Sequence, residues 1–246
     1  MLFDKILGNS NIKNISLKNE IEKWLLYIDN KGELNRFLPR LTKMDDRKIN
    51  EVLAEISSAY LLESLLNLKV TGWEVPTISD KNVDFTIDLN SEEVYCEVKS
   101  PSWQSELSKK EKLGGRKAQG KYKKNEVRFF GHWRNIRHAI KKAYPKFLSN
   151  CYNLVIIQDD LIVPILDFPT DIQIEIALFE GKGIYDNEKG VFIGNDYENV
   201  GGVLFIDINP TSRNKVYKCK FVGNPNALKA YKLPIKNCYL SSNSGN

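Results

Sequence analysis

The most regular pattern of apolar and polar positions in this chain lies within residues 83–99. Apolar side chains occupy every second position, first at Val83, Phe85, Ile87 and Leu89 and then at Val94, Cys96 and Val98. A period of two is typical of a strand with one buried face. Because only a short polar break at Asn90 and Ser91 separates the runs, they predict a hairpin with a two-residue loop.

The polar face of this hairpin carries charges of the same sign. Pairing Leu89 with Glu92 and counting back sets Asp84 opposite Glu97, and directly opposite residues have Cβ atoms about 4.5–5.5 Å apart. Two carboxylates so placed repel each other, which indicates a nearby cation. A divalent ion held by oxygen ligands meets this need, and Lys99 lies on the same face. An ordinary hairpin with a solvated charged face is the alternative.

A longer helical pattern precedes the hairpin. Apolar residues recur every three or four positions along residues 48–68, which predicts a helix with one buried stripe. Asp45 or Asp46 can cap its N-terminus. Glu55 lies beside the stripe, so its carboxylate either reaches solvent or points into a site.

The remaining pattern alternates helices with strands. We expect helices at residues 17–28, 127–148 and 171–180, and strands at 70–75, 154–158, 190–194, 202–208 and 217–222. The order of strand, helix and strand between residues 95 and 158 predicts a right-handed crossover. The expected fold class is therefore α/β, with a central mixed β-sheet flanked by helices and a C-terminal β-containing extension.

The acids and the lysine of the hairpin also follow a known order. Asp84 followed by Glu97-Val98-Lys99 resembles the signature of the PD-(D/E)XK nuclease superfamily, although Val83 stands where the superfamily name has proline. The resemblance spans about residues 47–160 and implies a restriction-endonuclease-like core. It implies that Asp84 and Glu97 bind Mg²⁺, with Mn²⁺ as a substitute, and that Lys99 assists the attacking water. It also favours Glu55, followed by an Ala-x-x-Leu stretch, as the helix glutamate that completes the catalytic and metal site.

The resemblance and the breaks in the pattern together divide the chain. We expect an N-terminal helical segment at residues 1–46, the nuclease-like core at 47–160, a C-terminal extension of the same domain at 161–240 and a disordered tail at 241–246.

Composition limits the classes of protein that the chain can represent. Its 246 residues, 42% of them apolar and 27% charged, suit a globular protein with one sizeable core. No run approaches eighteen apolar residues, so we expect no membrane association and a cytoplasmic location. The four cysteines are widely spaced, which favours buried thiols over a zinc site or a disulfide framework.

Positive charge is concentrated in one segment. Residues 109–146 hold fourteen Lys and Arg against two Glu, a balance of +12 in a chain of net charge +5, so the remainder carries −7. Such an asymmetry indicates a polyanionic partner. The residues expected to contact DNA are Arg116, Lys117, Lys121, Lys123, Lys124, Arg128, Arg134 and Arg137.

The sequence as a whole predicts a Mg²⁺-dependent endonuclease that hydrolyses phosphodiester bonds in DNA, and homodimer formation is left open. Two alternatives remain. The first is a catalytically inactive nucleic-acid-binding module, and the second is a partner-binding subunit whose basic face meets an acidic protein.

Overall fold

A computed structural model gives the fold. It describes residues 1–8, 10, 12–42, 45–78, 80–101, 132–158, 170–181, 188–209, 216–235 and 238–241. The disordered tail was expected at residues 241–246, but Ser241 is the last residue of β7, and residues 242–246 lie outside the described residues. Residues 102–131, which hold much of the basic segment, also lie outside them.

The described chain begins with a run of helices, and strands and further helices follow. The helical elements are α1 (Leu2–Leu7), α2 (Ile15–Asn30), α3 (Leu34–Thr42), α4 (Asp46–Tyr60), the π-helical turn η1 (Leu61–Leu65), α7 (His132–Ala143), the 3₁₀ turn η4 (Tyr144–Lys146) and α8 (Asp171–Leu178). The strands are β1 (Val70–Pro76), β2 (Asn82–Leu89), β3 (Glu92–Lys99), β4 (Tyr152–Gln158), β5 (Gly202–Ile208), β6 (Val216–Gly223) and β7 (Cys238–Ser241). None of the described helices is long and apolar enough to cross a membrane.

The described strands form one mixed sheet in the order β1-β2-β3-β4-β5-β6-β7. Pairing is parallel between β3 and β4 and between β4 and β5, and antiparallel elsewhere. The predicted α/β class with a central mixed sheet is confirmed. The segment expected as a C-terminal extension supplies β5, β6 and β7, so it continues the central sheet beyond β4.

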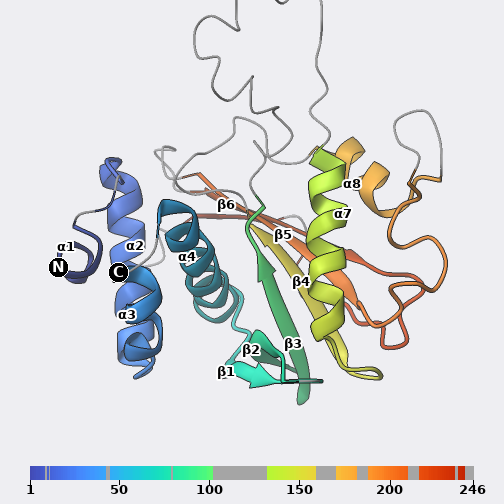
Figure 1. Ribbon diagram of the computed structural model, residues 1–246, viewed down its shortest axis with the longest axis horizontal. Coiled ribbons are helices and arrows are strands. Elements are labelled where there is room, and N and C mark those ends of the chain that lie inside the picture. Colours follow the sequence, from blue (N-terminus) through green and yellow to red (C-terminus); the bar gives the residue numbers. More distant parts are fainter. Residues whose placement is uncertain are drawn as a thin grey trace, which may run out of the picture.

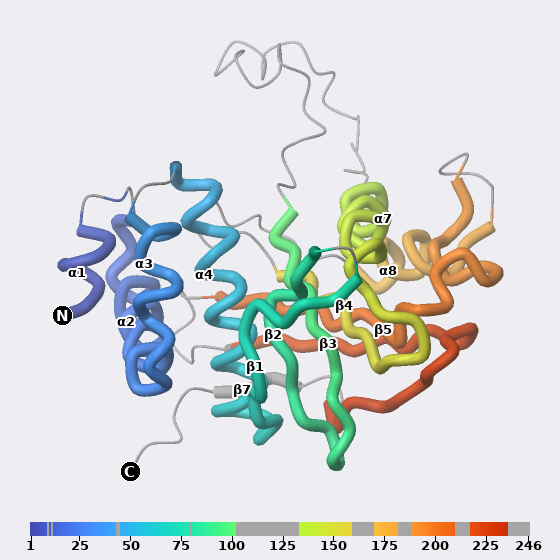
Figure 2. Tube along the Cα trace, turned by 60° about the horizontal axis from the view of Figure 1, so that its bottom comes forward, coloured from blue at the N-terminus to red at the C-terminus, as the bar shows by residue number. Residues whose placement is uncertain are grey.

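Helices cover both faces of the sheet (Figure 1). Helices α1 to α4 lie on one side, with α4 between α3 and strand β3, and α7 and α8 lie on the other side (Figures 1 and 2). Strand β4 contributes side chains to the hydrophobic core on each face of the sheet. Leu154 and Ile156 belong to the cluster under α4, and Val155 and Ile157 belong to the cluster under α7. A run of apolar residues such as Leu154–Ile157 is the pattern expected for a strand between two helical layers.

The predicted hairpin is confirmed. Leu89 pairs with Glu92 and Phe85 with Cys96, where the observed pairing of β2 with β3 ends. Asp84 and Glu97 are the next residues on the two strands. Asn90 and Ser91 have φ of 56° and 68°, the geometry of a tight two-residue hairpin turn. One expectation is wrong at the strand end: Val83 packs into the α7 cluster, whereas Phe85, Ile87 and Leu89 face α4.

Two other predictions need adjustment. The strand expected at residues 190–194 is wrong, because this backbone completes the C-terminus of α8. The amides of Val191 and Phe192 donate to the carbonyls of Ala177 and Leu178 at 3.0 and 2.8 Å, groups that have no partner within the helix. The helix expected at residues 48–68 is present as α4 and η1, and Asp45 caps it by accepting from the Lys48 amide at 3.0 Å.

Candidate active site

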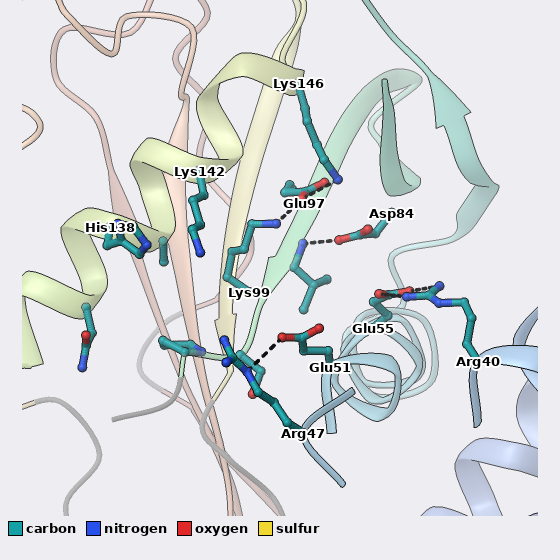
Figure 3. Close-up of a pocket in the computed structure, with 15 residues that line it drawn as sticks. Arg40, Arg47, Glu51, Glu55, Asp84, Glu97, Lys99, His138, Lys142 and Lys146 are labelled. Atoms are coloured by element: carbon teal, nitrogen blue, oxygen red, sulfur yellow. Dashed lines mark hydrogen bonds and ion pairs between the residues drawn. The ribbon is translucent and has the colours of Figure 1, made fainter. Parts of the chain in front are cut away.

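A pocket of about 470 Å³ opens where β2 begins and β3 ends, between α4 and α7. Figure 3 shows its charged lining, with carboxylates on the strands and α4 and with basic side chains on either side. The charged residues and the histidine that line it are Arg40, Arg47, Glu51, Glu55, Asp84, Glu97, Lys99, His138, Lys142 and Lys146. The four residues predicted as catalytic, Glu55, Asp84, Glu97 and Lys99, therefore line one pocket.

Asp84 and Glu97 reach the pocket from neighbouring strands. Asp84 Oδ2 accepts a hydrogen bond from the Val98 amide at 2.6 Å, which fixes one of its oxygens. Glu97 is fully buried, and its Oε1 receives both Lys99 Nζ and Lys146 Nζ, the latter at 2.7 Å. Glu97 Oε2 is buried and accepts no hydrogen bond from the described residues. A buried carboxylate oxygen in this state is costly unless a ligand completes its coordination.

The pKa values of these acids reflect burial and mutual repulsion. Burial raises the pKa of Asp84, and Lys146 and Lys99 work against that rise. Burial and then the Asp84 carboxylate raise the pKa of Glu97, again against the pull of the two lysines. For Lys99, burial works against the charged form, yet Glu97 and Asp84 raise its pKa above the ordinary value. The site thus holds carboxylates that gain from any further positive charge.

Glu55 projects from α4 and binds to Arg40 of α3. Arg40 of α3 donates to both of its oxygens, through Nη2 to Oε1 and through Nη1 to Oε2 at 2.8 Å. Burial, followed by the Asp84 charge, raises the pKa of Glu55 to about 7 although Arg40 opposes the shift. The structure thus places Glu55 in the pocket with Arg40 on its carboxylate, and its role as a metal ligand stays a prediction.

Sequence reasoning missed Lys146 and Arg40, which pair with the predicted acids Glu97 and Glu55. Lys146 was counted only as part of the basic segment, and the η4 turn at the end of α7 brings it to Glu97, 49 positions away in the sequence. Arg40 lies in α3, which no pattern predicted. The sequence around a single Lys or Arg does not indicate which acid it will pair with. The parallel pairing of β3 with β4 brings the end of α7 close to Glu97.

The residues predicted to bind DNA have different positions. Arg116, Lys117, Lys121, Lys123, Lys124 and Arg128 lie outside the described residues. Arg134 is exposed on α7. Arg137 is 2% exposed and donates to the carbonyls of Ile176 and Ala177 at 2.6 and 3.3 Å. The prediction that Arg137 contacts DNA is therefore wrong, because its guanidinium fastens α7 to the end of α8.

The donor set suits a magnesium ion. Within the described ranges, no cluster of three or more His, Cys, Asp or Glu side chains is arranged for a metal. Mg²⁺ needs fewer protein ligands, because it keeps several waters and is commonly held by one or two carboxylates together with substrate phosphate. Asp84 and Glu97 supply two carboxylates, and the unpartnered Glu97 oxygen offers a lone pair. The residues present therefore fit the ion.

Basic side chains border the acids on two sides. Arg47 of α4 stands on one side, ion-paired to Glu51 at 3.5 Å, and His138 and Lys142 of α7 stand on the other (Figure 3). The carboxylates at the base of the pocket therefore lie between two basic walls. This arrangement suits a negatively charged ligand that binds together with a cation.

Comparisons with protein-family models, with curated proteins and with solved structures gave no match for this chain.

Proposed function

We propose that this protein is a Mg²⁺-dependent endonuclease that hydrolyses phosphodiester bonds in DNA on a restriction-endonuclease-like core. The observation that carries the proposal is the convergence of Asp84, Glu97 and Lys99 in one pocket, with one buried Glu97 oxygen lacking a hydrogen bond from the described residues. The order of these residues resembles the PD-(D/E)XK signature, and the basic walls of the pocket match a polyanionic substrate.

Each group has a distinct task in the proposed reaction. A Mg²⁺ ion bound to Asp84 and Glu97 would supply Lewis-acid polarisation of the phosphate and a more acidic water. Lys99 Nζ, on the same face as Glu97, stabilises the negative charge that develops on the phosphoryl oxygens and orients the attacking water. Glu55 and Arg40 hold the wall of the pocket, and Arg47, His138 and Lys142 position the flanking phosphates.

The direct test is cleavage of supercoiled plasmid and of short duplex DNA, with Mg²⁺ and with EDTA. The proposal predicts cleavage only with Mg²⁺, and its loss in Asp84→Asn. The matched control is Asp80→Asn, which removes the same charge from an exposed turn before β2 and should cleave like the parent.

Two results separate the alternatives. Salt-dependent DNA binding without cleavage under any divalent cation would favour a catalytically inactive binding module. Neither binding nor cleavage would favour a partner-binding subunit, and the endonuclease proposal would be abandoned in both cases.

A further inference from the structure

The inner pocket contains equal numbers of negative and positive side chains. Its acids are Glu55, Asp84 and Glu97, and its cations are Arg40, Lys99 and Lys146. The ion pairs among them neutralise the site while no metal is bound. A divalent ion at Asp84 and Glu97 would add two positive charges. A cation that already occupies one of these carboxylates would then be repelled.

The three cations differ in how firmly the fold holds them. Arg40 makes two hydrogen bonds to Glu55, which is not one of the strand acids. Lys99 is two residues from Glu97 on β3, so the strand itself keeps the two side chains together. Lys146 reaches Glu97 from a different element, the η4 turn, through one ion pair of 2.7 Å. Lys146 can therefore leave Glu97 by side-chain rotation, without disturbing the sheet.

We propose that Lys146 is an internal counter-ion that competes with a divalent cation for Glu97. It neutralises this carboxylate while no metal is bound, and metal binding releases its ammonium toward the phosphate of the substrate. The inference rests on the proposed function for the assignment of Asp84 and Glu97 as cation ligands. It adds a residue that links metal binding to substrate binding.

The surroundings of Lys146 favour the release of its ammonium toward the substrate phosphate. Its side chain is 29% exposed, so the ammonium has access to the open part of the pocket. Lys142 and His138 stand one and two turns earlier along α7 and line the same pocket (Figure 3). A released Lys146 would join these side chains and complete a basic wall on the α7 side.

The test is the affinity for Mn²⁺, measured by isothermal titration calorimetry without DNA. Lys146→Met removes the competing charge and keeps much of the side-chain volume, so Mn²⁺ should bind roughly tenfold more tightly, a typical coupling between two sites. Lys146→Arg keeps the charge and should bind Mn²⁺ like the parent. Lys142→Met is the matched control, because it removes a charge from the same wall without an ion pair to Glu97, and it should change the affinity much less.

The outcomes are separable from those of the nuclease assay. An unchanged or weaker Mn²⁺ affinity in Lys146→Met, or an equal gain in Lys142→Met, would overturn the counter-ion role. If Lys146→Met does not fold, Lys146→Gln gives the same comparison with a polar side chain. A parent protein that binds no Mn²⁺ would overturn both proposals. If Lys146→Met binds Mn²⁺ more tightly but the parent protein does not cleave DNA, the counter-ion role is supported and the nuclease proposal is rejected.

Discussion

Two antiparallel strand pairs of the sheet differ in the signs of the charges that they bring together. In the β5–β6 pair, Asp207 lies directly opposite Lys218, so a cation across the strand faces the acid. In the β2–β3 pair, Asp84 and Glu97 lie next to the last paired residues, Phe85 and Cys96, and line one pocket, where their charges repel. Opposite charges across a pair stabilise a sheet, whereas like charges destabilise it.

The environments of the two pairs follow from this difference. Burial raises the pKa of Asp207, and the Lys218 charge works against that rise. In the β2–β3 pair, the cations that bind Glu97 are Lys99, at the end of β3, and Lys146, in the distant η4 turn. One oxygen of Glu97 still accepts no hydrogen bond from the described residues. The opposite charges of the β5–β6 pair offset each other within the sheet, whereas the acids of the β2–β3 pair support the proposed cation site.

The largest expected effect separates the lysines of the two pairs. Lys99→Ala should slow DNA cleavage by a factor on the order of 10²–10⁴, because it removes charge stabilisation in the transition state, while DNA affinity changes little. Lys218→Ala, at the self-neutralised pair, should leave the cleavage rate unchanged. Single-turnover rates and binding isotherms measure both quantities. A parallel collapse of affinity and rate in Lys99→Ala would make Lys99 a phosphate-binding residue.

The second effect is a pH dependence of the metal-free protein. Burial, assisted by Asp84, raises the pKa of Glu55 from 4.5 to about 7. The folded protein therefore binds more protons than the unfolded chain between these values, so the free energy of unfolding should fall as pH rises from about 4.5 to about 7. A shift of this size corresponds to a loss of up to about 3 kcal/mol.

Urea unfolding in EDTA across this pH range measures the slope. Glu55→Gln should flatten it. Glu51→Gln, on the same helix but exposed, should retain it. A slope of the opposite sign in the parent would mean that Arg40 holds Glu55 charged and that the acids of the pocket do not repel each other as the account requires.

The smallest effect concerns stability and has opposite signs in the two strand pairs. Without metal, Asp84→Asn should melt at the same temperature as the parent or higher, because it relieves repulsion and keeps an oxygen for the Val98 amide. Asp207→Asn should be less stable by roughly 0.2–1 kcal/mol, because it weakens a favourable pair. Mg²⁺ should raise the melting temperature of the parent but not of Asp84→Asn. Thermal melts with Mg²⁺ and with EDTA decide the matter, and a metal-free Asp84→Asn that melts well below the parent would make Asp84 a structural residue.

The sequence was most informative where a local rule determines the structure. Alternation and the Asn90-Ser91 break predicted the hairpin and its register, and helical spacing predicted α4 with Glu55 at its buried edge. Each of these features depends on residues close together in the chain. Three of the four predicted catalytic residues belong to the hairpin itself, so its register alone places them on neighbouring strands.

The remainder depended on tertiary contacts that local patterns do not contain. Arg137 was counted as a surface charge, but the carbonyls at the end of α8 bind it inside the fold. Lys146 was counted in the same basic segment, but the turn after α7 carries it into the acidic pocket. The pattern of charges predicts how many cations are present, and the packing of helices against the sheet decides which of them are structural and which line the site.

The most direct test of the central claim is an anomalous-scattering measurement on crystals soaked in Mn²⁺. The account predicts one ion bound to both Asp84 and Glu97, with metal–oxygen distances of roughly 2.0–2.3 Å, and Lys146 displaced from Glu97. Crystals in which Lys146 still pairs with Glu97 and no ion lies between the two acids would contradict the account, and the β2–β3 charges would then belong to the fold alone.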